Sequence, residues 1–198
     1  MPKPDVSEAR KTQILQAAQR VFARRPFLEV TMQEIAQEAG LSIGGVYWYF
    51  KSKDEIIAAL LQQNAANITA VLHQLAQATG PVRERLSAFF EQVLAATDEI
   101  AALYLTGAKL YAMTSRDPQM QAVMQEIGSG YRQGLSALIQ QGIDSGEFRP
   151  VAADEVAEAL LGLYEGIMLL WLASPARAEP PPALATGAML ILEGLTWD

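Results

Sequence analysis

The stretch TMQEIAQEAGLSIGGVYWYFKSKDEI, residues 31–56, carries the clearest structural signals in the chain. Thr31 followed by Glu34 three residues later is a capping box, which predicts the start of a helix. Gly40 is a natural C-terminal stop, and Ser42 can cap a second, short helix. We therefore expect a helix, a glycine-containing turn and a second helix within residues 31–50, which is the spacing of a helix-turn-helix.

Apolar residues at helical spacing continue on both sides of this stretch. A first helix is expected over residues 7–24 and a long one over 54–78, after which Gly80-Pro81 breaks the chain. No segment alternates over the length of a strand, so the predicted fold is all-α, with an N-terminal head of three short helices and a larger helical body. In the body we expect helices at about 82–97, 100–113, 118–144 and 154–173, a proline-rich linker at 174–182, and a last helix at 183–196.

The composition excludes several classes of protein. The 198 residues are 51% apolar and 19% charged, which is a globular composition, and they include no cysteine for disulfides or thiolate metal sites. A single histidine, His73, excludes His-clustered zinc sites and most Ser-His triads. Since the sequence also has no GxxxxGK[ST] loop and no carboxylate pair that stands out, we expect neither an enzyme nor a cofactor or metal.

The charges are unevenly distributed along the chain. Residues 1–53 contain eight Lys/Arg and five Asp/Glu, a balance of +3, whereas residues 54–198 contain seven and seventeen, a balance of −10. A basic head on an acidic body suits a head that meets an anion such as nucleic acid. The N-terminus has no apolar signal-peptide region, and the most apolar run, 159–173, is short and includes Glu165. We therefore expect a cytoplasmic protein that does not enter a membrane.

The opening stretch also resembles the N-terminal signature of the TetR (tetracycline-repressor) family of bacterial transcriptional regulators. That pattern runs from a Thr-capped helix through an Ala-Gly-Val/Leu-Ser turn to Gly-x-Leu/Val-Tyr-x-Tyr/His-Phe, then x-x-Lys and an acidic residue. AAQRVF, residues 17–22, fits the end of the family's first helix. The resemblance covers about residues 8–68 and implies a DNA-binding domain there, with its helix-turn-helix at 31–50, and a regulatory and dimerisation domain at 69–198.

The resemblance implies roles for individual residues of the head. Thr31, Tyr47, Tyr49 and Lys53 occupy positions that contact the phosphate backbone in such proteins, and Gln33, Ile43, Gly44 and Gly45 occupy positions that face base edges. With the helix cap and the lysine nearest the helix end added, the predicted DNA-binding set is Thr31, Gln33, Ser42, Ile43, Gly44, Gly45, Tyr47, Tyr49, Lys51 and Lys53.

Position 43 departs from the family, which often has lysine there. Neither Ile43 nor the two glycines after it can donate a hydrogen bond to a base, so Ile43 could offer only an apolar contact to a thymine methyl. Gln33 is then the best candidate for a bidentate contact, with adenine preferred. Val46 and Phe50 are expected to pack the second helix against the head. For Trp48 we favour a core position over a DNA contact, and both stay open.

The body is expected to hold a homodimer interface and a ligand site. The last two helices are the most apolar and, in the resembled family, form a four-helix interface with a partner, although some of their residues must serve the chain's own core. The predicted interface residues are Leu160, Leu161, Tyr164, Leu184, Ala188, Ile191 and Leu195. The predicted ligand-lining residues, which could equally be core, are Phe89, Phe90, Tyr104, Tyr111, Met113, Met124, Met168 and Trp171.

The leading hypothesis is therefore a homodimeric repressor that a small, largely apolar ligand releases from a palindromic operator in double-stranded DNA. A DNA-binding regulator controlled by a protein partner, or one that acts without an inducer, is the alternative. A filled body without a cavity would favour that alternative.

Overall fold

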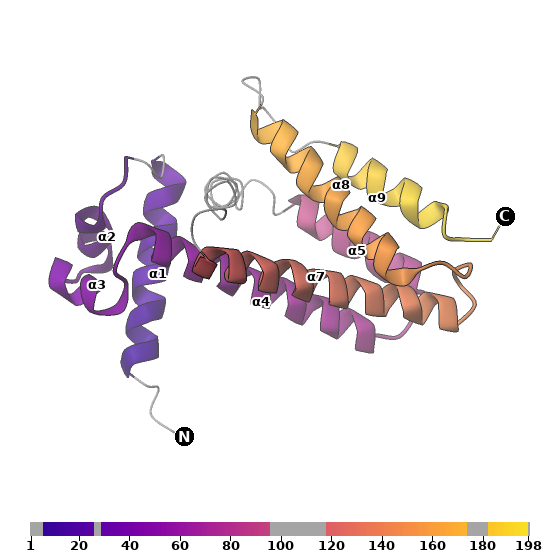
Figure 1. The fold of residues 1–198 in the computed structure, drawn as a ribbon, viewed down its shortest axis with the longest axis horizontal. Helices are drawn as coiled ribbons and strands as arrows, with labels where there is room; N and C mark the ends of the chain where they lie inside the picture. The colour runs from indigo at the N-terminus through magenta and orange to yellow at the C-terminus, as the bar shows by residue number, and fades with distance from the viewer. Residues whose placement is uncertain (1–5, 26–28, 96–117, 174–181, 198) are drawn as a thin grey trace. The chain divides into compact units, whose positions relative to one another are not determined.

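The computed structural model describes residues 6–25, 29–95, 118–173 and 182–197, and Figure 1 shows their arrangement. Across these residues the regular structure consists of eight helices with no strand, which confirms the all-α prediction. In this part of the chain no helix is long and apolar enough to cross a membrane. The helices are α1 (Val6–Arg24), α2 (Met32–Ala39), α3 (Ile43–Tyr49), α4 (Lys53–Gln77), α5 (Val82–Ala95), α7 (Pro118–Asp144), α8 (Ala153–Ala173) and α9 (Ala183–Glu193).

The helix boundaries lie close to the predicted ones. The largest difference is at α9, which ends at Glu193 rather than at residue 196. There the chain turns, and the N–H of Arg149 donates to the carbonyl of Leu195 (2.8 Å), so the segment after α9 pairs with the loop before α8. The helix predicted at 100–113 and most of the linker predicted at 174–182 lie outside the described residues.

The chain divides into two compact units. The first contains residues 1–63 and 99–123, and the second contains residues 64–98 and 124–198. This division describes packing alone, so the predicted functional domains at 8–68 and 69–198 stay predictions.

The first unit has its own apolar core, built by α1, α2, α3 and the start of α4. Gln13 Nε2 of α1 donates to the carbonyl of Ala39 (2.6 Å), and Arg20 Nε donates to the carboxylate of Glu38 (2.7 Å), so α1 is tied to α2 by polar contacts as well. The buried residues are Ile14, Leu15, Ala18, Val21, Phe22, Val30, Met32, Ile35, Ala36, Val46, Phe50, Ile56, Ile57 and Leu60.

The second unit is a helical bundle in which α7 runs alongside the second half of α4, and α8 and α9 lie side by side (Figure 1). Gln141 Nε2 of α7 donates to the carbonyl of Ala76 (3.2 Å), and Arg85 Nη2 of α5 donates to Gln141 Oε1 (2.9 Å). At Gly142 a Cβ would lie 2.3 Å from the ring of Phe148, so only glycine allows this loop to fold back onto α7. These contacts fix the bundle at the end where α4 stops.

Candidate DNA-binding site

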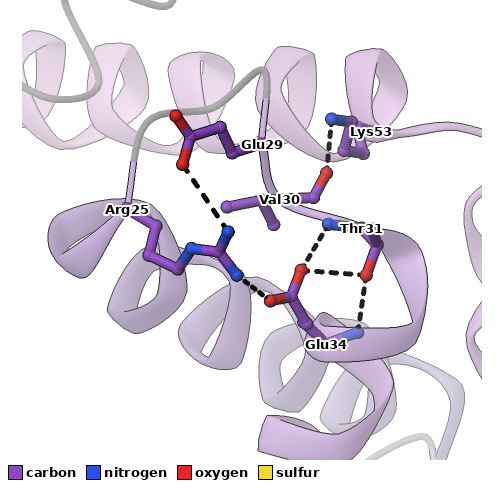
Figure 2. A network of polar contacts seen from close by, with 6 residues as sticks. All are labelled: Arg25, Glu29, Val30, Thr31, Glu34 and Lys53. Atoms are coloured by element: carbon purple, nitrogen blue, oxygen red, sulfur yellow. Dashed lines mark hydrogen bonds and ion pairs between the residues drawn. The ribbon is translucent and has the colours of Figure 1, made fainter.

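The first helix of the predicted helix-turn-helix starts with the expected capping box. Thr31 Oγ1 accepts a hydrogen bond from the N–H of Glu34 (3.2 Å), while Glu34 Oε2 accepts from the N–H (2.8 Å) and the hydroxyl (2.9 Å) of Thr31. Figure 2 shows this reciprocal pair at the start of α2. Because the pair satisfies donors that the helix itself cannot use, it fixes where α2 begins.

Charged side chains extend this network across the loop before α2. Arg25 donates to Glu34 Oε1 and lies 3.6 Å from Glu29, and Lys53 Nζ donates to the carbonyl of Val30 (Figure 2). The hydrogen bond from the Thr31 N–H is the largest of several effects that hold the pKa of Glu34 below its ordinary value of 4.5. Both donors of Thr31 are therefore occupied by an ionised carboxylate.

The turn between the two helices has the chemistry that the sequence indicates. Gly40 adopts a left-handed conformation (φ 65°), its N–H donates to the carbonyl of Gln37 (3.1 Å), and the N–H of Leu41 donates to that of Ala36 (2.9 Å). This pattern is a Schellman motif, which ends α2 and redirects the chain. Ser42 Oγ then accepts from the N–H of Gly45 (3.1 Å) and caps α3.

Few side chains anchor α3 to the head. Val46 is fully buried and Phe50 nearly so, which confirms the packing roles predicted for them. Ile43 and Tyr49 are half-buried and also pack against the head core. Lys51 follows the helix and donates from Nζ to the carbonyl of Tyr47 (2.9 Å), which satisfies one of the last carbonyls of α3.

The outward face of α3 consists of Gly44, Tyr47 and Trp48, with Lys51 just beyond the helix end. Positions i, i+3, i+4 and i+7 lie on one side of a helix. Trp48 is 79% exposed, so the core position favoured for it is wrong. It follows Val46 by two residues, or about 200° around the helix, and therefore points away from the core that Val46 faces.

Two parts of the chain match the sequence profiles of known protein families. Residues 14–60 match the sequence profile of bacterial regulatory proteins of the tetR family, and residues 81–193 match the BetI-type transcriptional repressor C-terminal profile. The second match alone covers more than half of the chain. The chain belongs to the tetR family. It is a DNA-binding transcriptional regulator.

Individual relatives agree with the family assignment. The uncharacterized HTH-type transcriptional regulator YfiR of Bacillus subtilis is 27% identical over 188 residues, which are 94% of this chain and 91% of YfiR. A TetR transcription regulator from Haloarcula marismortui has the same fold, with a TM-score of 0.82 at 23% identity over 96% of this chain and 100% of that one. FadR from Bacillus subtilis in complex with stearoyl-CoA also has this fold, with a TM-score of 0.72 at 21% identity, over 93% of this chain and 97% of that one.

The structure of this tetR-family regulator places the other predicted DNA-binding residues in the same head. Gln33 is exposed on the first turn of α2, and Ser42 is exposed at the cap of α3. Gly45 and Lys53 are half-buried, and Lys53 also holds the loop carbonyl of Val30.

The predicted interface residues of α8, α9 and the segment after α9 divide into two groups. Leu160, Leu184, Ala188 and Leu195 are buried within the chain itself, whereas the other three (Leu161, Tyr164 and Ile191) are half-buried. The large apolar side chains that are exposed among the described residues of α8 and α9 are ones that the sequence prediction did not include, namely Leu169, Leu170, Met189 and Leu190.

The predicted ligand-lining residues are also distributed unevenly. Phe89 and Met168 are buried, and the rings of Phe89 and Phe90 meet edge to face, with centroids 5.4 Å apart. Met124 and Trp171 are half-buried. The remaining three (Tyr104, Tyr111 and Met113) lie outside the described residues.

A small apolar cavity lies between α5, α8 and α9. It has a volume of about 10 Å³, roughly the space of one water molecule. Burial raises the pKa of Tyr164, one of its lining residues, to about 12, and the nearby Glu165 carboxylate adds to the shift. Apolar residues at helical spacing in α5 and α8 could have indicated the members that the sequence prediction missed. The lining residues are Phe90, Val93, Leu94, Leu160, Leu163, Tyr164, Leu184 and Ala188.

Proposed function

We propose that this regulator is a homodimeric repressor, without catalytic activity, that a small and largely apolar ligand releases from a palindromic operator in the cytoplasm. The observation that carries the proposal is the exposed apolar face of α8 and α9. The BetI-type repressor profile that matches residues 81–193 supports the sign of regulation. The stearoyl-CoA bound in the FadR structure has a long apolar acyl chain, which supports an effector with a large apolar part.

The apolar face of α8 and α9 is suited to a second copy of the chain. Leu170 is 74% exposed and Leu190 is 63% exposed, and burying such side chains contributes about 1.5–3 kcal/mol each. Gly162 and Gly166 are exposed one turn apart on α8, and no heavy atom lies within 4 Å of a Cβ built at either. A partner helix could therefore approach α8 closely. A two-fold dimer would present two α3 helices to half-sites about 34–36 Å apart.

The head would bind DNA through the predicted residues. Gln33 has an exposed amide able to read a base edge, and Lys51 has an exposed ammonium able to neutralise phosphate charge. Thr31 could reach a phosphate only by exchanging Glu34 for it, since its two donors are occupied. We expect Gln33→Ala to relax sequence preference and Lys51→Ala to weaken all sequences about equally. Gel-shift titrations on a selected duplex and its scrambled form distinguish these results.

The ligand would enter the body next to the small cavity. Tyr164 offers one polar group in an otherwise apolar lining, which is typical of sites for apolar molecules. Because about 10 Å³ cannot hold such a molecule, α5, α8 and α9 would have to separate when it binds. Release from DNA then requires the ligand to prefer the separated arrangement over the DNA-bound one.

The same cavity favours one alternative. An apolar cavity this small also suits a regulator controlled by a protein partner, or one without an inducer. A panel of ligands with large apolar groups, including stearoyl-CoA with its long acyl chain, separates the two. Under the leading proposal at least one ligand raises the melting temperature and lowers DNA affinity, and Ala188→Leu, which fills the cavity, abolishes both effects. If no ligand changes either quantity, the alternative holds.

Sedimentation velocity of the full chain tests the dimer. We expect the wild type to sediment as a dimer and the double variant Leu170→Glu, Leu190→Glu to sediment as a folded monomer that binds palindromic DNA at least tenfold more weakly. Gln92→Glu, an exposed change on α5, is the matched control and should leave the dimer intact. A double variant that remains dimeric would place the interface on another surface.

A further inference from the structure

Trp48 presents more of its surface to solvent than any other large apolar side chain in the described residues. A tryptophan offers about 150–250 Å² of mostly apolar surface, so its exposure represents a large amount of burial that the free head does not use. Trp48 is not part of the apolar core formed by α1, α2, α3 and the start of α4, so packing within the head does not explain it.

The position of Trp48 on α3 points to DNA as its partner. Gly44 lies one turn earlier on the same face, and a Cβ built there would meet no heavy atom within 4 Å. Within α3, which the structure describes completely, Tyr47 and Trp48 are the exposed residues that have a side chain. Lys51, exposed on the same face, adds a positive charge at the end of this stripe. The face thus combines close backbone approach, an aromatic surface and a cation.

Ile43 is less suited to the apolar contact that the sequence assigned to it. Its side chain is half-buried and packs against the head core, so part of its surface is already used. Trp48, at 79% exposure, keeps most of its surface available. An indole has one N–H donor and no acceptor, so its main means of distinguishing bases is contact with an apolar group. In the major groove that group is the 5-methyl of thymine.

We propose that Trp48 is a specificity-determining residue of this regulator, and that its indole packs against a thymine methyl in each half-site of the operator. The proposal rests on the proposed presentation of α3 to the operator half-sites, here in the major groove, and it requires neither a ligand nor a particular sign of regulation. Gly44 contributes by letting the backbone of α3 approach the base edges closely enough for the contact.

The experiment uses the full-length protein and a duplex that the wild type selects from a random-sequence pool. Each thymine of that duplex is then replaced in turn by deoxyuridine, which lacks only the 5-methyl group, and the Kd is measured by fluorescence anisotropy. For the wild type we expect one thymine in each half-site at which the replacement weakens binding about fourfold, the effect of one buried methyl. In Trp48→Ala the same replacement should have no effect.

Two further variants make the result specific. Trp48→Phe keeps an apolar ring without the N–H and should retain the sensitivity to deoxyuridine, whereas Ile43→Ala should retain it if Trp48 makes the contact. The proposal is overturned if the sensitivity persists in Trp48→Ala, if Ile43→Ala removes it instead, or if the wild type has no sensitive thymine. Unchanged thermal unfolding of Trp48→Ala excludes a folding defect. If the wild type enriches no sequence at all, the DNA-reading role of the whole head fails, which is distinguishable from failure at Trp48 alone.

Discussion

The two consecutive helices α2 and α3 are held by different kinds of interaction. α2 has a reciprocal capping box at its start, a Schellman motif at its end and four buried residues among eight, namely Met32, Ile35, Ala36 and Ala39. α3 has a side-chain cap from Ser42 at its start, the hydrogen bond from Lys51 to the carbonyl of Tyr47 at its end, and one buried residue, Val46, among seven. α2 thus buries half of its residues, whereas α3 buries one of seven and leaves Tyr47 and Trp48 exposed.

The largest effect that follows from this comparison is on stability. Ile35 is fully buried in α2, and Ile35→Ala should reduce the free energy of unfolding by about 2–5 kcal/mol, the range for large-to-small changes in a core. Val46 is also fully buried, but Val46→Ala removes fewer atoms from a helix with fewer neighbours, so we expect a loss of about 1–2 kcal/mol. Urea unfolding followed by circular dichroism measures both.

Gln37→Ala provides the matched control on α2, because Gln37 is exposed on the same helix as Ile35. Its effect should stay within about 0.5 kcal/mol. A loss from Val46→Ala as large as that from Ile35→Ala would contradict the view that α3 is the more weakly held helix.

Gly40 and Gly44 flank the turn, and substitution by alanine should have opposite effects on stability at the two positions. Gly40 has φ 65°, so Gly40→Ala should destabilise the head by about 1–2 kcal/mol although the space around it is open. Gly44 is helical and equally open, so Gly44→Ala should stabilise α3 by about 0.5–1 kcal/mol. The added methyl would nevertheless hinder close approach to the groove, so DNA affinity should fall.

Urea unfolding and anisotropy titration of both variants test this pair. The informative result is a Gly44→Ala protein that is more stable and binds DNA more weakly than the wild type. If both variants lose stability, the difference in backbone conformation between Gly40 and Gly44 does not determine the effect of the substitution. If Gly44→Ala binds DNA as well as the wild type, position 44 does not face the groove.

The sequence predicted α2 well because its determinants are local. The capping box and Gly40 depend on residues a few positions apart, and the structure has both. The packing of Val46 and Phe50 was also predictable, here from the family resemblance. Trp48 was not, since a run of four aromatics shows no polar position that would mark the outward side of so short a helix.

In the body, too, the sequence could not predict which apolar side chains are buried. α8 and α9 carry leucines on more than one face, so spacing alone cannot decide which leucines turn inward. Leu160 and Leu184 are buried, while Leu170 and Leu190 are exposed, and only the packing of α8 against α9 and their neighbours distinguishes them. Long-range polar contacts, such as that of Lys53 with the carbonyl of Val30, leave no pattern in the sequence.

The smallest expected effect is on the pH dependence of stability, which should differ between the cap of α2 and the cap of α3. Hydrogen bonds from Thr31, together with Arg25, hold the pKa of Glu34 below its ordinary value of 4.5. A carboxyl whose pKa is lower in the folded state contributes stability that is fully present above its unfolded pKa. That contribution is lost as the pH falls through the folded pKa. α2 should therefore lose part of its cap in acid.

Thermal unfolding of wild type and Glu34→Gln at pH 7 and pH 3 measures this loss. The glutamine oxygen can still accept from the Thr31 N–H but carries no charge, so the difference in melting temperature should be larger at pH 7 than at pH 3. Ser42→Ala is the control, because the hydroxyl that caps α3 does not ionise and its loss should lower the melting temperature similarly at both pH values. The lowered pKa of Glu38, caused by Arg20 and Arg24, is common to all three proteins and cancels in the comparison. A difference between wild type and Glu34→Gln that is the same at pH 7 and pH 3 would show that the charge of Glu34 does not stabilise the start of α2.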